Sequence, residues 1–319
     1  MRVAVTGAGG SMGFDVAHCL AAAGHEVVGC DADPTGLLFA ARGCHETRRL
    51  PKAHDPGFVD AVRALPVDHV FACPDAEVAE LAVADALVHT PIPHRVAVAV
   101  TLDKYATYQT CREAAQFPRT YLWRHDPFHF RGGPWWVRPC EGAGGRAARR
   151  CASGADVAAW VSLNPDVSAW VLHDYLPGEN LTVNMLWWRG ECVASACARR
   201  DGYICGHVAA VTGDVSAMTT VERPDACHAA SWAVVALPGT PHGLFGVDLK
   251  CDAHNAPCVT EINPRLSGRP RLYEAAGVNL PALWLDMVEY GRPLHETRQR
   301  HGVRLLRRVD QPPVIEGGP

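Results

Sequence analysis

Apolar and polar residues along the first hundred positions follow the order of a βαβ unit. Residues 2–6 form a short β-rich run, a glycine turn follows at 7–13, and an alanine-rich helical stretch comes next. Two more apolar runs, 26–30 and 67–73, have the length and composition of buried strands. The pattern predicts a parallel, doubly wound sheet with helices on its faces over residues 1–100.

The glycine turn leaves two interpretations open. Gly7, Gly9 and Gly13, followed about 20 positions later by Asp31, approach the arrangement that binds NAD or NADP, in which the acidic residue holds the ribose hydroxyls. The spacing is one residue longer than that fingerprint, and glycines also let a tight turn pack a helix closely on a sheet. We favour the structural turn and keep an NAD-dependent oxidoreductase as the rival hypothesis.

Two carboxylates follow the strand at 67–73. Asp75 and Glu77 lie at its carboxyl end, where open α/β sheets place their ligands. They can orient a substrate there, but acidic residues also cap the first turn of a helix, and we favour capping.

The middle of the chain changes to a β-rich pattern with one flexible interruption. The strand-like run 135–139 carries Arg138 and leads into Gly142, Gly144 and Gly145. Consecutive backbone N–H groups in such a loop can surround phosphate, and a cation at its base can neutralise the charge. Further on, the β-runs 181–188 and 191–199 flank a two-residue Arg189-Gly190 turn, which predicts a hairpin.

A second hairpin near the end of the chain gathers oxygen ligands. Residues 246–250 and 259–265 read as its two strands. Because side chains alternate along a strand, Glu261 and Asn263 share one face, and a short turn brings Asp248 opposite them. Three hard oxygen donors at one spot suit Mg²⁺ held for a nucleotide triphosphate, with Mn²⁺ as an alternative. A half-exposed hairpin with solvated acids is the alternative interpretation.

Composition removes several classes of protein. With 34 acidic and 30 basic residues, the net charge of -4 gives no concentrated basic face for nucleic acid or a membrane surface. No apolar run is long enough for a membrane span, and no export signal precedes the first strand. The thirteen cysteines show no Cys-x-x-Cys spacing, so we expect reduced, structural thiols in a cytoplasmic protein.

Four separated segments together resemble the ATP-grasp superfamily, nearest to its carbamoyl-phosphate-synthase-like and carboxylate-amine ligase branch. They are Asp103-Lys104, the Arg138 strand with its glycine loop, Tyr175-Leu176-Pro177-Gly178, and the hairpin with Asp248 and Glu261-x-Asn263-Pro-Arg265. The resemblance implies an α/β fold in which a small Rossmann-like domain precedes an ATP-grasp fold of two α+β subdomains. The implied domains are 1–100, a lid subdomain 101–187 with the glycine-rich loop, a C-terminal subdomain 188–300 with the metal hairpin, and a tail 301–319.

The resemblance also assigns roles to residues. It implies that Lys104 and Arg138 hold ATP phosphates, that residues 142–145 cover them, and that Arg265 steadies transferred phosphate or a substrate carboxylate. Arg199 or Arg200 is a further candidate phosphate-side cation. The implied adenine-binding hinge consists of His173, Asp174, Tyr175 and Leu176, with Asn180 at the ribose position, and the implied metal ligands are Asp248, Glu261 and Asn263. Apart from the resemblance, Arg269 and Arg271 follow the hairpin directly, and we keep them beside Arg265 as candidates that bind an anionic substrate.

Three positions depart from the superfamily pattern. Arg138 stands where a lysine is common, Asp174 replaces a glutamate at the hinge, and Asn180 stands where many members carry a ribose-binding glutamate. The first keeps its charge, whereas the third puts the ribose contacts in doubt. The metal ligands are unaffected.

The resemblance implies an ATP-dependent ligase that activates a carboxylate as an acyl phosphate and joins it to an amine, with Lys104 and Arg265 as catalytic residues. Its partners are small carboxylates and amines, with no nucleic acid or membrane, and a homodimer stays open. Alternatives are carboxylate or carbamate phosphorylation without ligation, a nucleotide-binding relic, and the oxidoreductase. We expect His242 to be structural and the chain beyond Gly302 to be partly disordered.

Overall fold

The first region is the predicted parallel sheet. In the computed structural model, which describes residues 1–84, 90–123, 133–142, 144–204, 215–308 and 311–316, its strands run in the order β3-β2-β1-β4, all parallel. The elements of this region are β1 (Arg2–Thr6), α1 (Ser11–Ala22), β2 (Glu26–Asp31), α2 (Pro34–Ala40), β3 (Glu46–Arg49), α3 (Phe58–Arg63), β4 (His69–Phe71) and α4 (Asp75–Val83).

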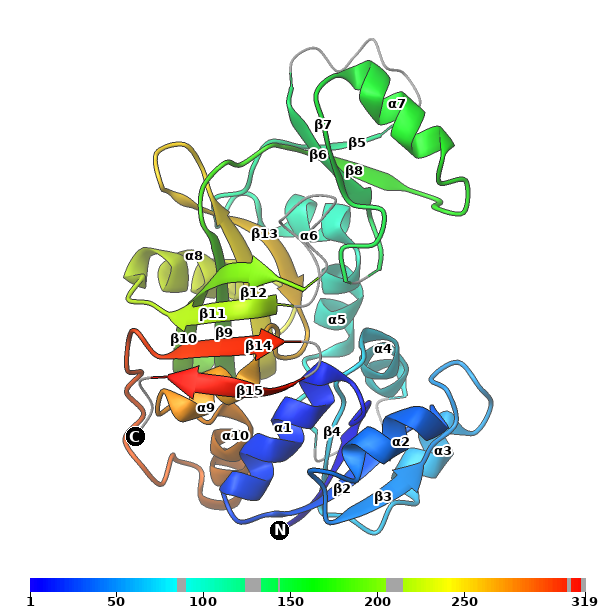
Figure 1. Cartoon of the computed structure of the whole chain (residues 1–319), viewed down its shortest axis with the longest axis vertical. Helices are drawn as coiled ribbons and strands as arrows, with labels where there is room; N and C mark the ends of the chain where they lie inside the picture. The colour runs from blue at the N-terminus through cyan, green and yellow to red at the C-terminus, as the bar shows by residue number, and fades with distance from the viewer. Residues whose placement is uncertain (85–89, 124–132, 143, 205–214, 309–310, 317–319) are drawn as a thin grey trace.

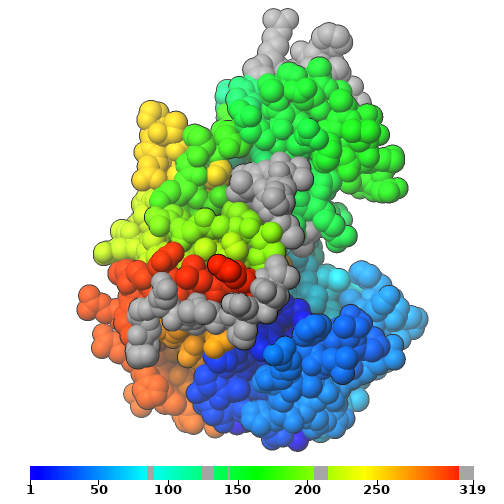
Figure 2. Space-filling view, in the orientation of Figure 1, coloured from blue at the N-terminus to red at the C-terminus, as the bar shows by residue number. Residues whose placement is uncertain are grey.

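A separate lobe, which we call the lid lobe, holds a small antiparallel sheet, the lid sheet (Figure 1). Its strand order is β5-β8-β6-β7, and one helix packs on it over a core that contains Trp135, Val157, Trp170 and Leu172. Figure 2 shows this lobe overhanging the body of the molecule, with a recess between it and the first region. The elements are β5 (Thr120–Leu122), β6 (Trp135–Pro139), β7 (Arg149–Cys151), α7 (Gly154–Ser162) and β8 (Trp170–Asp174).

The largest sheet has the order β13-β12-β9-β10-β11-β14-β15 and is antiparallel throughout. The predicted hairpin is confirmed as β9 and β10, and both turn residues, Arg189 and Gly190, have the positive φ of a two-residue turn. The strands are β9 (Asn180–Trp188), β10 (Glu191–Tyr203), β11 (Val215–Thr220), β12 (Gly243–Cys251), β13 (Pro257–Asn263), β14 (Arg304–Arg308) and β15 (Gln311–Glu316).

Helices cover this sheet and tie it to the first region. The helices are α5 (Arg95–Leu102), α6 (Lys104–Cys111), α8 (Pro224–Val235), α9 (Pro270–Ala275) and α10 (Leu280–Tyr290). Helix α1 packs against α9 and α10, and Val16 and Leu20 of α1 share one core with Trp284 and Leu305. The two ends of the chain therefore meet in a single hydrophobic cluster (Figure 1).

The expectation of a partly disordered tail is wrong for residues 304–308, because β14 pairs with β11 and extends the large sheet. Val303 and Leu305 are 1% and 0% exposed and flank the exposed Arg304, so a short period-two pattern beside three charged residues makes this strand. The boundary expected at residue 187 falls inside β9, and the link between β8 and β9 separates the two antiparallel sheets. The predicted order of a parallel sheet followed by antiparallel sheets is present.

Candidate functional site

The predicted oxygen-ligand hairpin forms in the expected register. Asp248 of β12 lies opposite Glu261 of β13, and Gly246 lies opposite Asn263, with the Val247–Ile262 pair between them. The three oxygen-bearing side chains therefore belong to alternate pairs of the ladder, which share one face. Asn263 is 8% exposed, and the side chains of Asp248 and Glu261 are 19% and 22% exposed. Local strand alternation is enough to bring these groups together.

Asp248 is held by groups from three other segments. Its Oδ1 accepts from Arg200 Nη2 at 2.6 Å, Thr182 Oγ1 at 3.1 Å and Ser267 Oγ at 3.3 Å. Arg200, rather than Arg199, is thus the cation that faces the hairpin, since Arg199 pairs with Glu179 and Asp201.

Sequence reasoning missed Thr182 and Ser267. Thr182 lies directly opposite Asp248 in the β9–β12 pairing. Two strands separated by about sixty residues in sequence can be aligned only once the sheet order is known, so no local signal identifies this hydroxyl.

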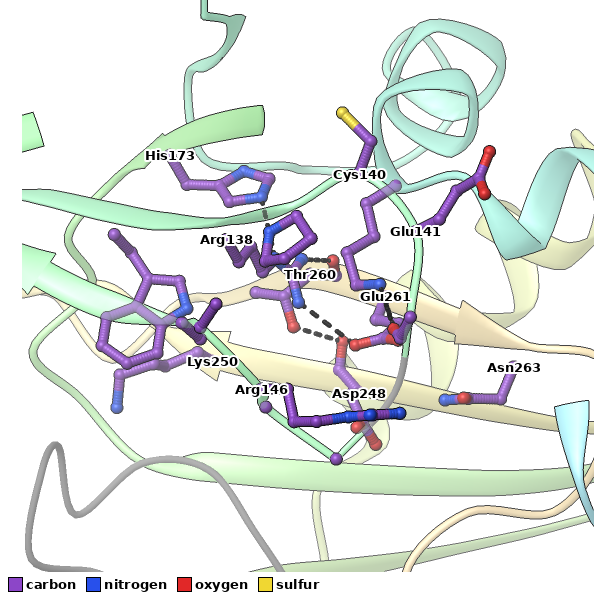
Figure 3. Close-up of a pocket in the computed structure, with 18 of the residues that line it drawn as sticks. Arg138, Cys140, Glu141, Arg146, His173, Asp248, Lys250, Thr260, Glu261 and Asn263 are labelled. Carbon is purple, nitrogen blue, oxygen red and sulfur yellow. Dashed lines mark hydrogen bonds and ion pairs between the residues drawn. The ribbon is translucent and has the colours of Figure 1, made fainter. Parts of the chain in front are cut away.

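Glu261 binds two cations that reach it from outside its sheet. Arg138 Nη1 lies 3.1 Å from Oε2, and Lys104 Nζ lies 3.5 Å from Oε1. Arg138 also donates to the carbonyl of Thr260, so a strand of the lid lobe is bonded to the large sheet (Figure 3). Burial lowers the pKa values of Lys104 and Arg138, and the Glu261 carboxylate opposes that shift.

A chain of hydrogen bonds fixes Arg138 from its other side. Arg138 Nε donates to His173 Nε2 at 3.2 Å, and His173 Nδ1 lies 2.8 Å from Thr120 Oγ1, which itself donates to the Pro118 carbonyl. The hydroxyl must therefore accept from Nδ1–H, which makes His173 a neutral imidazole. Burial, then Arg138, lowers its pKa well below the usual range.

The remaining residues of the predicted hinge follow His173 along the chain. Asp174 accepts from Arg119 Nε at 2.6 Å, and the Tyr175 ring lies 4.9 Å from the Arg150 guanidinium. Leu176 and Asn180 line the cavity described below.

Lys250 is hydrogen-bonded to the same segment. Its Nζ donates to the Gly178 carbonyl at 2.8 Å and to Asn180 Oδ1 at 3.3 Å. A cation and an amide therefore occupy the place where the superfamily pattern has a glutamate.

The segment that contains Gly142, Gly144 and Gly145 is hydrogen-bonded to one of the two cations that bind Glu261. Gly142, Gly144 and Gly145 have φ values of 104°, 70° and 68°, which only glycine adopts easily, and Ala143 lies outside the described residues. Lys104 Nζ donates to the Gly142 carbonyl at 2.7 Å. One lysine thus connects the loop with Glu261.

The three candidate substrate arginines have different surroundings. Arg265 lines the cavity, and its guanidinium is bound by Asp75 at 2.6 and 2.8 Å. Arg269 is 3% exposed and pairs at 3.0 Å with Asp15 of α1, a residue with no exposed surface. Neither Arg269 nor Arg271 is among the described residues that line the cavity, so the structure does not bring them to the site.

The site has one cavity of about 710 Å³, a volume within the range of small-molecule sites. It lies where the lid sheet, the glycine segment and the β12–β13 hairpin meet (Figure 3). The predicted site residues on its surface are Lys104, Arg138, Gly142, Gly144, Gly145, His173, Asp174, Tyr175, Leu176, Asn180, Asp248, Glu261, Asn263 and Arg265. Arg146 and Arg200 line it too.

The first glycine turn has a different use. Gly9 N–H donates to Asp31 at 2.9 Å, and a Cβ on Gly9 would lie 2.3 Å from the Cα of Gly36 in α2. Asp31, the acid that would hold the ribose of NAD, is instead hydrogen-bonded to the turn, and α2 fills the space beside it. His242 packs between Trp188 and Trp284 and is not among the cavity residues described, which supports a structural role.

Comparison with known proteins gives a consistent result. The sequence matches the family described as ATP-grasp domain over residues 101–269, more than half of the chain. A search of curated proteins found no significant match. No helix among the described residues is long and apolar enough to cross a membrane.

Several solved structures share the fold at low sequence identity. L-amino acid ligase from Bacillus licheniformis aligns with a TM-score of 0.71 at 17% identity, over 96% of this chain and 79% of that one. N5-carboxyaminoimidazole synthetase from Staphylococcus aureus, complexed with ADP, gives 0.71 at 15%, over 96% and 81%. The biotin carboxylase domain of 2-oxoglutarate carboxylase from Hydrogenobacter thermophilus, with MgADP and bicarbonate, gives 0.73 at 11%, over 96% and 74%. The α/β fold predicted from sequence is confirmed.

Proposed function

The chain belongs to the ATP-grasp family, and from that premise we propose that it is an ATP-dependent ligase. A substrate carboxylate attacks the γ-phosphorus of ATP, ADP leaves, and an acyl phosphate forms. An amine then attacks the acyl carbon, loses a proton, and displaces phosphate. The products are an amide or peptide, ADP and phosphate.

The observation that carries this proposal is the charge arrangement of the cavity. Lys104 and Arg138 lie against Glu261, and Arg200 lies against Asp248, so cations and carboxylates face one another across the space. A nucleotide triphosphate and a divalent cation present the complementary set. Phosphoryl transfer needs this kind of positioning and charge neutralisation more than it needs a protein nucleophile.

The donor set suits a magnesium ion. Asn263 donates through Nδ2 to the Gly246 carbonyl, which leaves its amide oxygen as an acceptor beside the two carboxylates of Asp248 and Glu261. Among the described residues no cluster of three or more His, Cys, Asp or Glu side chains provides an alternative metal site. Mg²⁺ or Mn²⁺ on these three oxygen donors would neutralise phosphate charge and orient the phosphates.

The other cavity residues bind and enclose the reactants. Lys104 and Arg138 hold phosphates, and the backbone N–H groups near Gly142 and Gly144 cover them. His173 keeps Arg138 in place as a neutral acceptor. The lid lobe shields the acyl phosphate from water, which would otherwise hydrolyse it. Structural neighbours solved with ADP or MgADP support this nucleotide site.

Carboxylate phosphorylation that ends at the acyl phosphate is the second candidate. It is kept because a structural neighbour solved with MgADP and bicarbonate is a carboxylase domain, so a protein of this fold need not form an amide. The two candidates share every residue role up to the first phosphate transfer.

An ADP-release screen over amino acids and small carboxylic acids, each with and without a panel of amines, tests the proposal. We expect a carboxylate-dependent release of ADP and a condensed product by mass spectrometry. An acyl phosphate or hydroxamate trapped without amine would select the second candidate.

Matched variants make the screen decisive. Glu261→Gln should lower the rate at least a hundredfold, whereas Glu113→Gln, whose side chain is 89% exposed, should leave it unchanged. Tight ADP binding with no substrate-dependent turnover in the wild type would indicate a nucleotide-binding relic. Thermal stabilisation by NAD alone would overturn the proposal.

A further inference from the structure

An ion pair between two distant segments lies at one end of the cavity. Arg265 Nε and Nη2 donate to Asp75 Oδ1 and Oδ2 at 2.6 and 2.8 Å, a bidentate geometry. Asp75 begins α4 in the first region, 190 positions earlier in the sequence. The pair thus joins the parallel-sheet region to the segment that follows the metal hairpin.

Counting donors shows what remains for a ligand. A guanidinium has five N–H groups. Asp75 takes two, and the Leu266 carbonyl takes one from Nη1 at 2.9 Å. The two that remain belong to Nη1 and Nη2, which lie side by side at the end of the Arg265 side chain.

The two partners differ in their access to the cavity. Arg265 lines it, whereas Asp75 is not among the described lining residues. Both are mostly shielded, at 17% and 24% side-chain exposure, so the pair is only partly screened by water. Asp75 therefore has no direct contact with the cavity, and its hydrogen-bonded link to a ligand there runs through Arg265.

We propose that Asp75 is a positioning residue that clamps Arg265 so that its two free N–H groups meet the carboxylate, or the acyl phosphate derived from it, as a fork. The inference rests on the proposed function and extends it to the first region. It assigns the carboxylate end of the substrate to the part of the cavity beside Arg265. Two parallel donors match the two oxygens of a carboxylate or phosphate.

A purely structural role for Asp75 predicts something else. As an acidic residue in the first turn of α4, it also faces the positive end of that helix's dipole, which stabilises the helix. Losing that contribution would lower thermal stability and leave the kinetics of the folded enzyme intact.

Steady-state kinetics separate the two roles. Asp75→Asn should raise the KM for the carboxylate found in the screen about tenfold and leave the KM for ATP within twofold. Asp75→Glu restores the carboxylate and should recover most of the loss. Glu80→Gln is the matched control, because it removes the same charge from a half-exposed position of α4 and should change neither constant.

Inorganic phosphate tests the fork without turnover. In calorimetric titrations of protein saturated with MgADP, phosphate should bind the wild type and Glu80→Gln equally, and bind Asp75→Asn and Arg265→Lys about tenfold more weakly. Unchanged phosphate affinity in a folded Asp75→Asn protein, or no phosphate binding by the wild type, would overturn the inference. Failure of the ligase screen alone would not, so the two proposals fail separately.

Discussion

Two glycine-rich segments, one in the parallel-sheet region and one beside the cavity, look alike in sequence, but their glycines have opposite surroundings. In the first, a Cβ on Gly9 would lie 2.3 Å from the Gly36 backbone, and one on Gly13 would lie 2.3 Å from the Gly7 carbonyl. In the second, Gly142 and Gly144 have no atom within 4 Å of a built Cβ, and both have positive φ.

The difference separates two physical reasons for glycine. The first turn needs the absence of a side chain, because α1 and α2 close upon it. The second needs backbone freedom beside an open cavity. A glycine-rich motif therefore indicates a ligand site only when the space around it is free, and that depends on distant segments such as α2.

The largest expected effect is on folding. Gly9→Ala places a methyl group against rigid backbone, so the free energy of unfolding should fall by about 3 kcal/mol. Urea denaturation followed by tryptophan fluorescence measures it. Gly10→Ala is the control, since its nearest atom would be 3.3 Å away. Equal stabilities of the two variants would contradict the close-packing explanation.

The next effect concerns charge near the first turn. Glu77 is 6% exposed, and burial raises the pKa of its carboxyl to about 7 from 4.5. The folded state keeps this proton to a higher pH than the unfolded state does. Glu77 should therefore contribute a fall in the free energy of unfolding of about 3 kcal/mol as pH rises from about 4.5 to 7.

Glu77→Gln should remove that slope while leaving a smaller one from Asp15, whose pKa burial raises to about 6. Denaturation at pH 4.5, 6 and 7.5 checks this. A wild-type and variant pair with parallel pH profiles would show that Glu77 is ionised throughout.

A smaller effect tests the second segment's link to charge. Lys104→Met keeps the length of a buried side chain and removes the cation that joins Gly142 and Glu261. MgADP affinity by calorimetry should fall about tenfold, which corresponds to about 1.4 kcal/mol. Lys52→Met, at an exposed position, should bind as the wild type does. Equal affinities would remove Lys104 from the nucleotide site.

The smallest effect is expected for Gly144→Ala. No atom opposes the added methyl group, so only the positive φ is penalised, at about 1 kcal/mol of stability. Denaturation under the conditions used for Gly9→Ala gives the direct contrast. A loss as large as that of Gly9→Ala would end the distinction between the two segments.

Whether a contact could be predicted from the sequence depends on how far apart its two residues lie along the chain. The register of Asp248 and Glu261 depends on one short turn and on alternation along two strands, so it was predictable. The Asp75 pair with Arg265 joins segments that only the folded topology brings together. Strand β14 was missed because three of its five residues are arginines and its buried positions are limited to Leu305, with Val303 just before it.

Arg269 shows the same limit in another form. Its place after the β12–β13 hairpin suggested an anionic substrate, and its actual partner is Asp15, 254 positions away. The sequence shows that an arginine is charged, but it does not show which partner the side chain faces. Only packing decides whether that charge serves a ligand or the protein's own buried carboxylate.

The shared cluster of α1, α10 and β14 bears on how the chain is made. During synthesis Val16 and Leu20 leave the ribosome well before their core partners Trp284 and Leu305. The apolar face of α1 therefore lacks these partners until α10 and β14 have been synthesised. Apolar surface that stays uncovered on a nascent chain promotes aggregation, so synthesis of α10 and β14 ends that exposure.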